Sequence, residues 1–489
     1  MADTVAGLLR RHAADPNRIF AVLDGGVTTT YAEQLARSRR VAAGLRRRGA
    51  QRGDRVHVQL ANCREFFDVW FATALSGTVL VPTSPQFSAD ELAHVLDDAA
   101  PVVSIRDAAE VDALRADTTP GVEDTDDDEE AGPLAAILYT SGTTSRARGV
   151  MVTDANYVAV GNAVADHLSV TAEDRWLVVL PLFHANAQYY CTMSALVRGA
   201  SIALAPRFSA SGWQRQAQST EATLASLFAA PVRMVLASSP QPHDAHNRLR
   251  AVLFAQNISS TDATTFERRF GTRLLQIYGM TETVLPPTMN PPDDTRRWDS
   301  IGRPLPGVGL ELVDDHDNLV EGPGTGEMRI VGHPGQTLAA GYWHNPTATR
   351  DTFTDKGLRT GDLARRDGDG FLYFVDRSKD MIKRAGENVS AGEIERVAGD
   401  HPAVAECAAI GVTDPIRDEA VMLVATVRPG HEITADDLLH WCAERLSAFK
   451  VPSFVVFVDT LPRTSVGKVR KAELRALGEP GALQTILTG

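Results

Sequence analysis

Four short segments combine hydroxyl, glycine, carboxylate and basic residues in patterns that could bind a ligand carrying phosphate. The first is residues 133–150, PLAAILYTSGTTSRARGV, where an apolar run ends in a hydroxyl-rich loop. Gly142 allows close approach of the backbone, and the neighbouring hydroxyl groups are hydrogen-bond donors for an anion. These donors are Thr140, Ser141, Thr143 and Thr144. The GxxxxGK[ST] spacing of a Walker A loop is absent, and such loops also occur without ligands, so both interpretations stay open at this point.

The second segment, residues 274–283, reads LLQIYGMTET and predicts a strand followed by polar side chains. Ligands bind at strand ends in doubly wound sheets. Tyr278 could stack on a base, Thr281 could donate to a phosphate oxygen, and Glu282 could hold Mg²⁺, which prefers carboxylate and phosphate oxygens. The alternative is an ordinary capped helix start.

The remaining two segments lie toward the C-terminus. Residues 359–362, RTGD, place Asp362 about fifteen positions before Asp376 and Arg377, and an acidic side chain beside a nucleotide often accepts from ribose hydroxyls. Residues 461–470, LPRTSVGKVR, predict a loop that carries Lys468. The alternative for Lys468 is the usual one for a lone lysine, exposure to solvent.

Alternating helices and strands must position these segments. Residues 30–49 place Leu35, Ala42 and Leu45 on one helical face, and Gly49 closes the helix. A strand at 54–60, a helix at 66–75 and a strand at 79–82 follow. This order indicates a mostly parallel α/β sheet.

The later part of the chain changes character. Residues 309–314, 326–331 and 370–375 predict strands separated by turn residues. From Lys379 the order becomes helix 391–399, strands 404–412 and 419–427, and helix 435–446. We therefore predict an α/β fold: a large N-terminal domain, 1–378, of doubly wound sheets plus a β-rich subdomain, and a small α+β C-terminal domain, 379–489.

The composition is that of a folded, acidic protein. With 49 Lys+Arg against 62 Asp+Glu, the net charge is −13, which disfavours a nucleic acid or an anionic membrane as partner. The N-terminus lacks the apolar core of a signal peptide, and no run approaches the roughly 20 apolar residues that span a bilayer. We expect a cytoplasmic protein with reduced cysteines. The four cysteines are Cys63, Cys191, Cys407 and Cys442.

The order and spacing of the four segments resemble the adenylate-forming superfamily, which contains acyl-CoA synthetases, adenylation domains of peptide synthetases and beetle luciferases. The resemblance runs from about Thr30 to Lys471. Three runs, HANAQYY from His184, GENVS over Gly386–Ser390 and FKVP over Phe449–Pro452, resemble the crotonobetaine/carnitine-CoA ligase group. The resemblance implies activation of a small carboxylic acid by ATP and Mg²⁺ to an acyl-AMP, followed by thioester formation with CoA.

The resemblance also implies residue roles. Glu282 would hold Mg²⁺, Thr281 would contact the α-phosphate, and Lys468 would join the site for adenylation. The C-terminal domain would be a mobile lid that turns about Lys379 and brings residues 383–390 to the thiol. The implied ATP contacts are Thr140, Ser141, Gly142, Thr143, Thr144, Arg148, Gln256, Asn257, Tyr278, Asp362 and Arg377, and the implied residues on the CoA side are Lys383, Gly386 and Glu387.

His184 would lie at the mouth of the acid pocket, although it could also simply form local hydrogen bonds. Peptide-synthetase domains usually carry Asp at this position, so an α-amino acid is disfavoured. The mixed apolar and amide character of the implied lining favours a short polar or aromatic acid. That lining comprises Phe183, His184, Asn186, Gln188, Phe228, Pro231 and Leu285.

One departure from the family pattern concerns the phosphate loop. The usual Gly-x-Pro-Lys-Gly is replaced by Ser145-Arg146-Ala147-Arg148-Gly149. Arg148 keeps the positive charge and adds a planar fork of donors. The acceptor also stays open: relatives transfer the acyl group to a carrier-protein thiol or an amine, and a few activate nitrite to diazotise an arylamine. The sequence does not specify an oligomeric state.

Overall fold

The computed structural model describes residues 3–116, 134–140, 147–377, 381–384, 387–414, 418–463 and 469–477. The described residues form two compact units. Of the described residues, the first unit comprises those within 1–141, 146–310 and 330–358, and the second those within 311–329 and 359–489. The predicted domain boundary at 378/379 falls on residues outside the described ranges, and it stays a prediction.

The first unit contains a nine-stranded sheet, most of whose neighbouring strands run parallel. Its order is β14 (Arg303–Pro304), β13 (Thr288–Met289), β12 (Arg273–Tyr278), β11 (Ala251–Ala255), β10 (Leu224–Phe228), β8 (Arg175–Val178), β9 (Ser201–Leu204), β1 (Ile19–Val22) and β2 (Thr28–Thr30). β2, β13 and β14 are antiparallel additions at the edges.

A second sheet of the first unit has the order β5 (Val103–Ile105), β3 (Arg55–Val58), β4 (Val79–Pro82), β6 (Ala136–Thr140) and β7 (Arg148–Val152). Only β7 is antiparallel to its neighbour. The central strands of both sheets are mostly apolar, as is typical of strands that are covered on both faces. Both parallel sheets confirm the predicted fold class.

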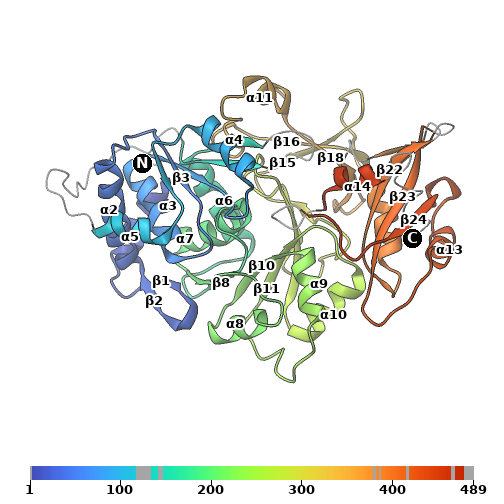
Figure 1. Cartoon of the computed structure of the whole chain (residues 1–489), viewed down its shortest axis with the longest axis horizontal. Coiled ribbons are helices and arrows are strands. Elements are labelled where there is room, and N and C mark those ends of the chain that lie inside the picture. Colours follow the sequence, from blue (N-terminus) through green and yellow to red (C-terminus); the bar gives the residue numbers. More distant parts are fainter. Residues whose placement is uncertain are drawn as a thin grey trace. The chain divides into compact units, whose positions relative to one another are not determined.

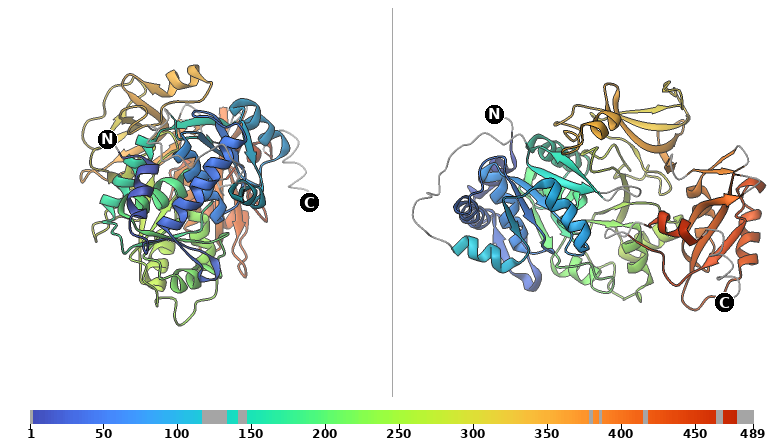
Figure 2. Two further views of the ribbon diagram at one scale, coloured as in Figure 1. Left: turned by 90° about the vertical axis from the view of Figure 1, so that its left-hand side faces the viewer. Right: turned by 45° about the horizontal axis from the view of Figure 1, so that its top comes forward.

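Helices pack around the strands of the first unit, as Figure 1 and Figure 2 show. They are α1 (Val5–Ala13), η1 (Asp24–Gly26), α2 (Tyr31–Arg47), α3 (Arg64–Ser76), α4 (Ala89–Ala99), α5 (Ala108–Ala116), α6 (Asp154–His167), the π-helix η2 (Asn186–Met193), α7 (Ser194–Arg198), α8 (Trp213–Ser219), α9 (Ala229–Ala237), α10 (Ser260–Phe270) and α11 (Pro346–Thr352). α3 packs on β3 and β4, while η2 packs on β8 and β10. One core joins the two sheets and includes the fully buried Trp70, Trp176 and Phe254.

A third sheet has the order β15 (Gly309–Val313), β16 (Gly324–Val331), β18 (Gly357–Arg366) and β17 (Phe353–Thr354), with β19 (Leu372–Arg377) paired to β18. β15, β16 and β19 correspond to the three strands that the sequence predicts at 309–314, 326–331 and 370–375, whereas β17 and β18 were not predicted. β19 begins two residues later than predicted, because Gly370 and Phe371 belong to the preceding turn, where Asp367 accepts from the Phe371 amide at 2.9 Å.

The second unit contains a fourth sheet, β21 (Glu387–Val389), β20 (Ile382–Arg384), β23 (Asp418–Val427) and β22 (Val404–Asp414), with β24 (Phe454–Phe457) beside β23. Its helices are α12 (Ala391–Gly399), α13 (Ala435–Ala443), η4 (Ala448–Lys450) and α14 (Lys471–Leu477). α12 has the predicted bounds, and α13 ends three residues earlier than predicted. α12 and α14 pack on β22, and α13 packs on β24.

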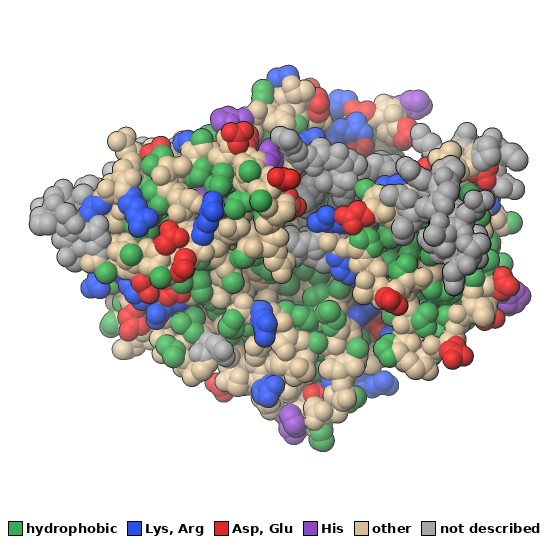
Figure 3. Space-filling view, in the orientation of Figure 1, with side chains coloured by type: hydrophobic (Ala, Val, Ile, Leu, Met, Phe, Trp, Pro, Cys, Tyr) green, Lys and Arg blue, Asp and Glu red, His purple; other side chains and the backbone are tan. Residues whose placement is uncertain are grey.

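The exposed surface carries side chains of several types. On the face drawn in Figure 3, acidic and basic side chains are interspersed with apolar ones. Among the described residues, no helix is both long enough and apolar enough to cross a membrane.

Candidate active site

The segment after β12 is a turn and not a helix, so the alternative of a capped helix start is wrong. The Thr283 hydroxyl accepts from the Met280 amide at 3.1 Å and donates to the Met280 carbonyl at 3.0 Å. This local bonding competes with helical hydrogen bonds. Pro286 and Pro287, which lack amide hydrogens, follow directly. The turn places Glu282 beside the end of the sheet.

Glu282 is buried, with 7% of its surface exposed, and its carboxylate is held from another part of the chain. The Tyr342 hydroxyl donates to Oε1 of Glu282 at 2.9 Å. The Ala339 amide donates to the Glu282 carbonyl at 3.0 Å. Burial raises the pKa of Tyr342, and the Glu282 carboxylate raises it further, so the phenol stays protonated and remains a donor.

Arg148 reaches the same tyrosine from β7. Its guanidinium carbon lies 5.5 Å from the centroid of the Tyr342 ring. The chain around Tyr342 follows β7, since Trp343 donates its amide to the Gly149 carbonyl at 2.7 Å and Ala340 donates to the Met151 carbonyl at 2.9 Å. The structure therefore brings Arg148 and Glu282 to the same side chain.

Thr140 lies opposite Arg148 in the antiparallel pair of β6 and β7. This register puts the beginning of the predicted phosphate loop next to the arginine that ends it. Four other candidates of that loop, Ser141, Gly142, Thr143 and Thr144, lie outside the described residues.

The predicted adenine contacts come from two adjacent parallel strands. Gln256 and Asn257 follow β11, and Tyr278 ends β12. The side-chain amide of Gln276 donates to the Gln256 carbonyl at 3.1 Å and to Oδ1 of Asn257 at 3.1 Å. Sequence reasoning missed Gln276. Its signal was a single amide in the otherwise apolar strand LLQIY.

Five of the implied acid-pocket residues lie close to η2 or to the end of β10. Asn186 in η2 accepts from the Ser226 hydroxyl of β10 at 2.8 Å. Gln188 is fully buried, and it donates to the Leu182 carbonyl at 2.7 Å and accepts from the Tyr157 hydroxyl. The rings of Phe183 and His184 are in contact, with centroids 4.4 Å apart. Phe228 ends β10.

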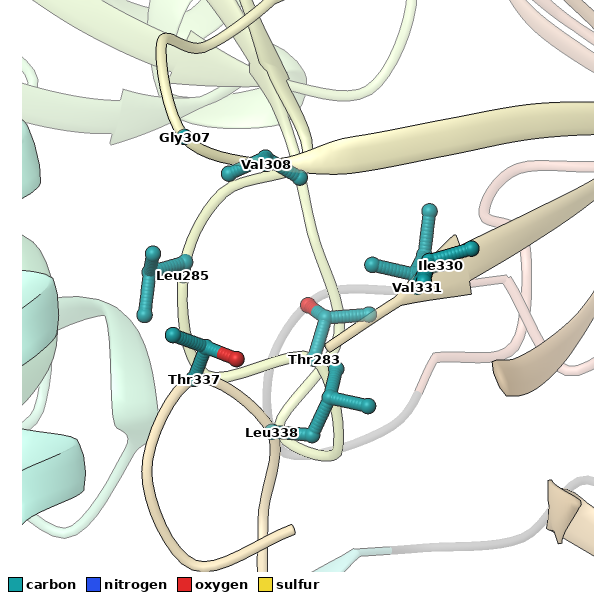
Figure 4. A pocket seen from close by; sticks show the side chains of 8 residues that line it. All are labelled: Thr283, Leu285, Gly307, Val308, Ile330, Val331, Thr337 and Leu338. Atoms are coloured by element: carbon teal, nitrogen blue, oxygen red, sulfur yellow. The ribbon is translucent and has the colours of Figure 1, made fainter. Parts of the chain in front are cut away.

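The other two implied lining residues lie on different elements. Pro231 belongs to α9, the helix after β10. Leu285 lines a cavity of about 10 Å³ together with Thr283, Val308 and Ile330, which Figure 4 shows. This cavity has room for roughly one water molecule. It cannot hold a carboxylic acid.

The predicted ribose contacts belong to the second unit. Asp362 on β18 lies opposite Arg377 on β19, and its side chain is buried. The neighbouring Asp376 accepts from the Gly392 amide at 3.1 Å and from the Ser390 hydroxyl at 3.4 Å, which ties β19 to the start of α12. The side chains of Arg377, Lys383 and Glu387, and all atoms of Lys379, Gly386 and Lys468, lie outside the described part.

The residues at Glu282 fit a magnesium ion that travels with a nucleotide. Among the described residues there is no group of three or more His, Cys, Asp or Glu side chains that could hold a metal by themselves. Mg²⁺ typically takes one or two carboxylates and completes its shell with substrate phosphates and water. A single buried carboxylate is compatible with that arrangement.

Two family models match the chain. The AMP-binding enzyme model matches residues 9–343, and the AMP-binding enzyme C-terminal domain model matches residues 393–468. Crotonobetaine/carnitine–CoA ligase from Escherichia coli O157:H7 is 34% identical over 486 residues, covering 92% of this chain and 94% of that protein.

Solved structures also resemble the chain. ATP-bound MatB from Rhodopseudomonas palustris has a TM-score of 0.89 and 28% identity, with 97% of this chain and 99% of that chain covered. o-Succinylbenzoate CoA synthetase (MenE) from Bacillus subtilis in complex with ATP and magnesium ion has a TM-score of 0.85 and 27% identity, with coverage of 96% and 99%. The same enzyme in complex with its acyl-adenylate intermediate has a TM-score of 0.85 and 26% identity, with coverage of 97% and 98%.

Proposed function

The chain belongs to the AMP-binding enzyme family, and on that premise we propose that it is an acid–CoA ligase that uses ATP and Mg²⁺. It forms an acyl-AMP from a carboxylic acid and then transfers the acyl group to CoA. The observation that carries this function is the 34% identity to a CoA ligase over 92% of the chain. The finer proposal is that the acid is short and polar or aromatic, and that the enzyme works in the cytoplasm.

The chemistry of the first step is a problem of like charges. A carboxylate oxygen attacks the α-phosphorus of ATP and pyrophosphate leaves, so two anions must approach each other. Mg²⁺, when bound, neutralises phosphate charge. In the proposed site Glu282 holds that ion, Thr281 contacts the α-phosphate, and Arg148 with residues 140–144 binds the outer phosphates. Lys468 contributes a positive charge to the same step.

In the second step the thiol of CoA attacks the acyl carbonyl, and AMP leaves with the bonding electrons. The acyl-AMP is a mixed anhydride that water would hydrolyse, so exclusion of water is required between the steps. We assign the thiol side to residues 383–390, including Lys383, Gly386 and Glu387. This assignment rests on their motif positions.

The acid specificity is proposed from η2 and its surroundings. His184 replaces the aspartate that would pair with an α-ammonium group, and Asn186 and Gln188 add amide groups on the adjacent turn. The side-chain amide of Gln188 is engaged internally, since it bonds to Leu182 and Tyr157. Asn186 accepts from Ser226 through Oδ1, whereas its buried Nδ2 has no hydrogen-bond partner among the described residues. A small acid with one further polar group or an aromatic ring suits such surroundings better than a long alkyl chain.

Pyrophosphate exchange across a panel of acids tests the function. Short polar acids, arylacids, long-chain acids and α-amino acids form the panel, and exchange is expected with the first two classes. Absence of exchange with every acid would contradict the adenylation step. Mass spectrometry of products formed with CoA, a carrier protein, or nitrite plus an arylamine then identifies the acceptor, and the thioester of CoA is the expected product.

Replacement of Lys468 separates the two half-reactions. We expect Lys468→Ala to abolish pyrophosphate exchange and to spare thioester formation from supplied acyl-AMP and CoA, because the charge is needed only while the phosphate is attacked. Single-turnover assays of each half-reaction provide the measurement. Equal loss of both half-reactions would show that the role assigned to Lys468 is wrong.

A further inference from the structure

Tyr342 connects two residues of the proposed ATP site that are far apart in the sequence. Its hydroxyl donates to Oε1 of Glu282 at 2.9 Å, and its ring lies under the guanidinium of Arg148, whose carbon is 5.5 Å from the ring centroid. Nothing in the spacing of the motifs indicated this contact. Glu282 comes from the turn after β12, Tyr342 from a segment bridged to Val150, and Arg148 from β7.

Contacts other than the Glu282 hydrogen bond already fix the position of Tyr342. Its amide donates to the Thr349 hydroxyl at 2.9 Å, and its ring packs edge-on against Phe353 with centroids 5.8 Å apart. An antiparallel bridge joins it to Val150. The phenol is therefore a rigid donor, and a rigid donor restricts the orientation of the carboxylate that accepts from it.

This arrangement gives a physical reason for the presence of arginine at position 148. A planar guanidinium stacks on an aromatic face, whereas a lysine ammonium is a point charge on a flexible stem. At 5.5 Å from the ring centroid Arg148 is within the range of a cation–π contact with Tyr342, and its planar fork offers a face to the ring that the lysine of the usual family pattern lacks. Arg148, which departs from the usual family pattern, and Tyr342 are therefore the two partners of one contact.

We propose that Tyr342 is a positioning residue for the divalent cation of the reaction: its hydroxyl holds the Glu282 carboxylate in one orientation, and Arg148 secures the ring that carries this hydroxyl. The inference rests on the proposed function, because it takes Glu282 as the ligand of the cation. Groups that orient a metal ligand commonly change metal affinity 10- to 100-fold when they are removed.

Direct binding of Mn²⁺ tests this role without turnover. The probe is the electron paramagnetic resonance signal of free Mn²⁺, titrated with the full chain in the presence of an ATP analogue that carries a methylene group between the α- and β-phosphorus atoms. We expect Tyr342→Phe to weaken Mn²⁺ binding roughly tenfold. Arg148→Lys, which keeps the charge and loses the stacking plane, is expected to weaken it about threefold.

Tyr373 provides a matched control. Its hydroxyl donates to Asp367 at 2.9 Å and the Arg365 guanidinium lies 4.2 Å from its ring centroid, so it has the same kinds of partner, with Asp367 in place of Glu282. Tyr373→Phe is expected to leave Mn²⁺ affinity unchanged. Thermal unfolding of each variant shows whether it is folded, and the comparison of Tyr342→Phe with Tyr373→Phe carries the test, because Arg148→Lys also alters the proposed phosphate contact.

A double-mutant cycle distinguishes positioning from a general effect. In the Glu282→Gln background, which itself weakens Mn²⁺ binding, the further change Tyr342→Phe is expected to have no added effect. Equal weakening by Tyr342→Phe in both backgrounds, or no weakening in the wild-type background, would overturn the inference. If Glu282→Gln binds Mn²⁺ as tightly as the wild type, the assignment of Glu282 in the proposed function fails, and the inference fails with it.

Discussion

His57 lies in the middle of β3 with no surface exposed, and both of its ring nitrogens face hydroxyl groups. Nδ1 is 2.7 Å from the Ser104 hydroxyl of β5, and Nε2 is 2.8 Å from the Thr83 hydroxyl after β4. Burial, together with the smaller effect of the nearby Arg106 charge, lowers the pKa of His57 from 6.5 to about 4. The neutral ring therefore joins three neighbouring parallel strands at physiological pH.

The low pKa of His57 predicts acid sensitivity of the fold. Between about 6.5 and about 4 the unfolded chain binds a proton at His57 that the folded chain does not, so the free energy of unfolding falls as the pH falls through this range. The contribution of His57 to the slope of the free energy of unfolding against pH approaches about 1.4 kcal/mol per pH unit. Urea unfolding of the wild type and of His57→Gln, whose amide can serve both hydroxyls without titrating, measures it.

The difference in the free energy of unfolding between the wild type and His57→Gln reports the titration of His57 alone, because other histidines such as His12 and His167 titrate in both proteins. We expect the wild type to lose stability more steeply on acidification. Parallel pH profiles of the two proteins would contradict the prediction.

Gly279 shows how closely two elements of the site approach each other. A Cβ atom at this position would lie 2.5 Å from the Tyr190 hydroxyl of η2. We expect Gly279→Ala to lower the free energy of unfolding by about 1–3 kcal/mol, as overpacking usually does. Combining it with Tyr190→Phe removes the obstructing oxygen and should recover part of the loss. Chemical denaturation of both variants is the measurement, and an absence of any recovery would show that the clash lies elsewhere.

At the level of elements, α12 depends on a carboxylate from outside the helix. The Ser390 hydroxyl accepts from the Glu393 amide at 3.2 Å at the N-terminus of the helix, and Asp376 of β19 accepts from the Gly392 amide at 3.1 Å. A carboxylate is also favoured there by the helix dipole. The chain is thereby tied to α12 directly beside Arg377, a predicted ribose contact.

Replacement of Asp376 should loosen this connection. We expect Asp376→Ala to lower the free energy of unfolding by about 1–3 kcal/mol, because the part-buried Gly392 amide and the Ser390 hydroxyl lose this acceptor. Asp376→Asn keeps one oxygen and should cost less. Hydrogen exchange of the α12 amides reports the local effect, and equal protection in the alanine variant and the wild type would refute it.

The whole molecule contains separate cores. One core joins the two large sheets of the first unit, and the second unit has its own cores on the two faces of β22 and β23. A compact unit with its own core can unfold as a cooperative unit. Chains of this kind often depart from two-state unfolding.

A core variant in the second unit tests this separation. Leu423 in β23 is fully buried among Ile394, Val404 and Leu438. We expect Leu423→Ala to cost about 2–5 kcal/mol in this unit. In calorimetry one transition should move to lower temperature while the other stays in place. A single transition that shifts as a whole would contradict the prediction.

Much of the fold could be predicted because its signals are local. The cap residues Thr30 and Glu33 and the apolar spacing of α2 lie within one stretch of chain, and so do the residues that start and end α12. The turn after β12 could not be separated from a helix start, because Thr283 bonds back to Met280 only in the folded turn. Contacts between side chains of different elements, such as the one between Gln276 and Asn257, could likewise not be predicted from the sequence.

The sequence by itself determined the family, the use of ATP and the order of the motifs, because each motif is a contiguous run whose residue types carry its chemistry. Only the tertiary structure decided which side chains meet. Arg148, Glu282 and Tyr342 are far apart in the chain and converge because residues 340–343 run along β7. A hydrogen bond of 2.9 Å depends on that alignment, and no spacing along the chain specifies it.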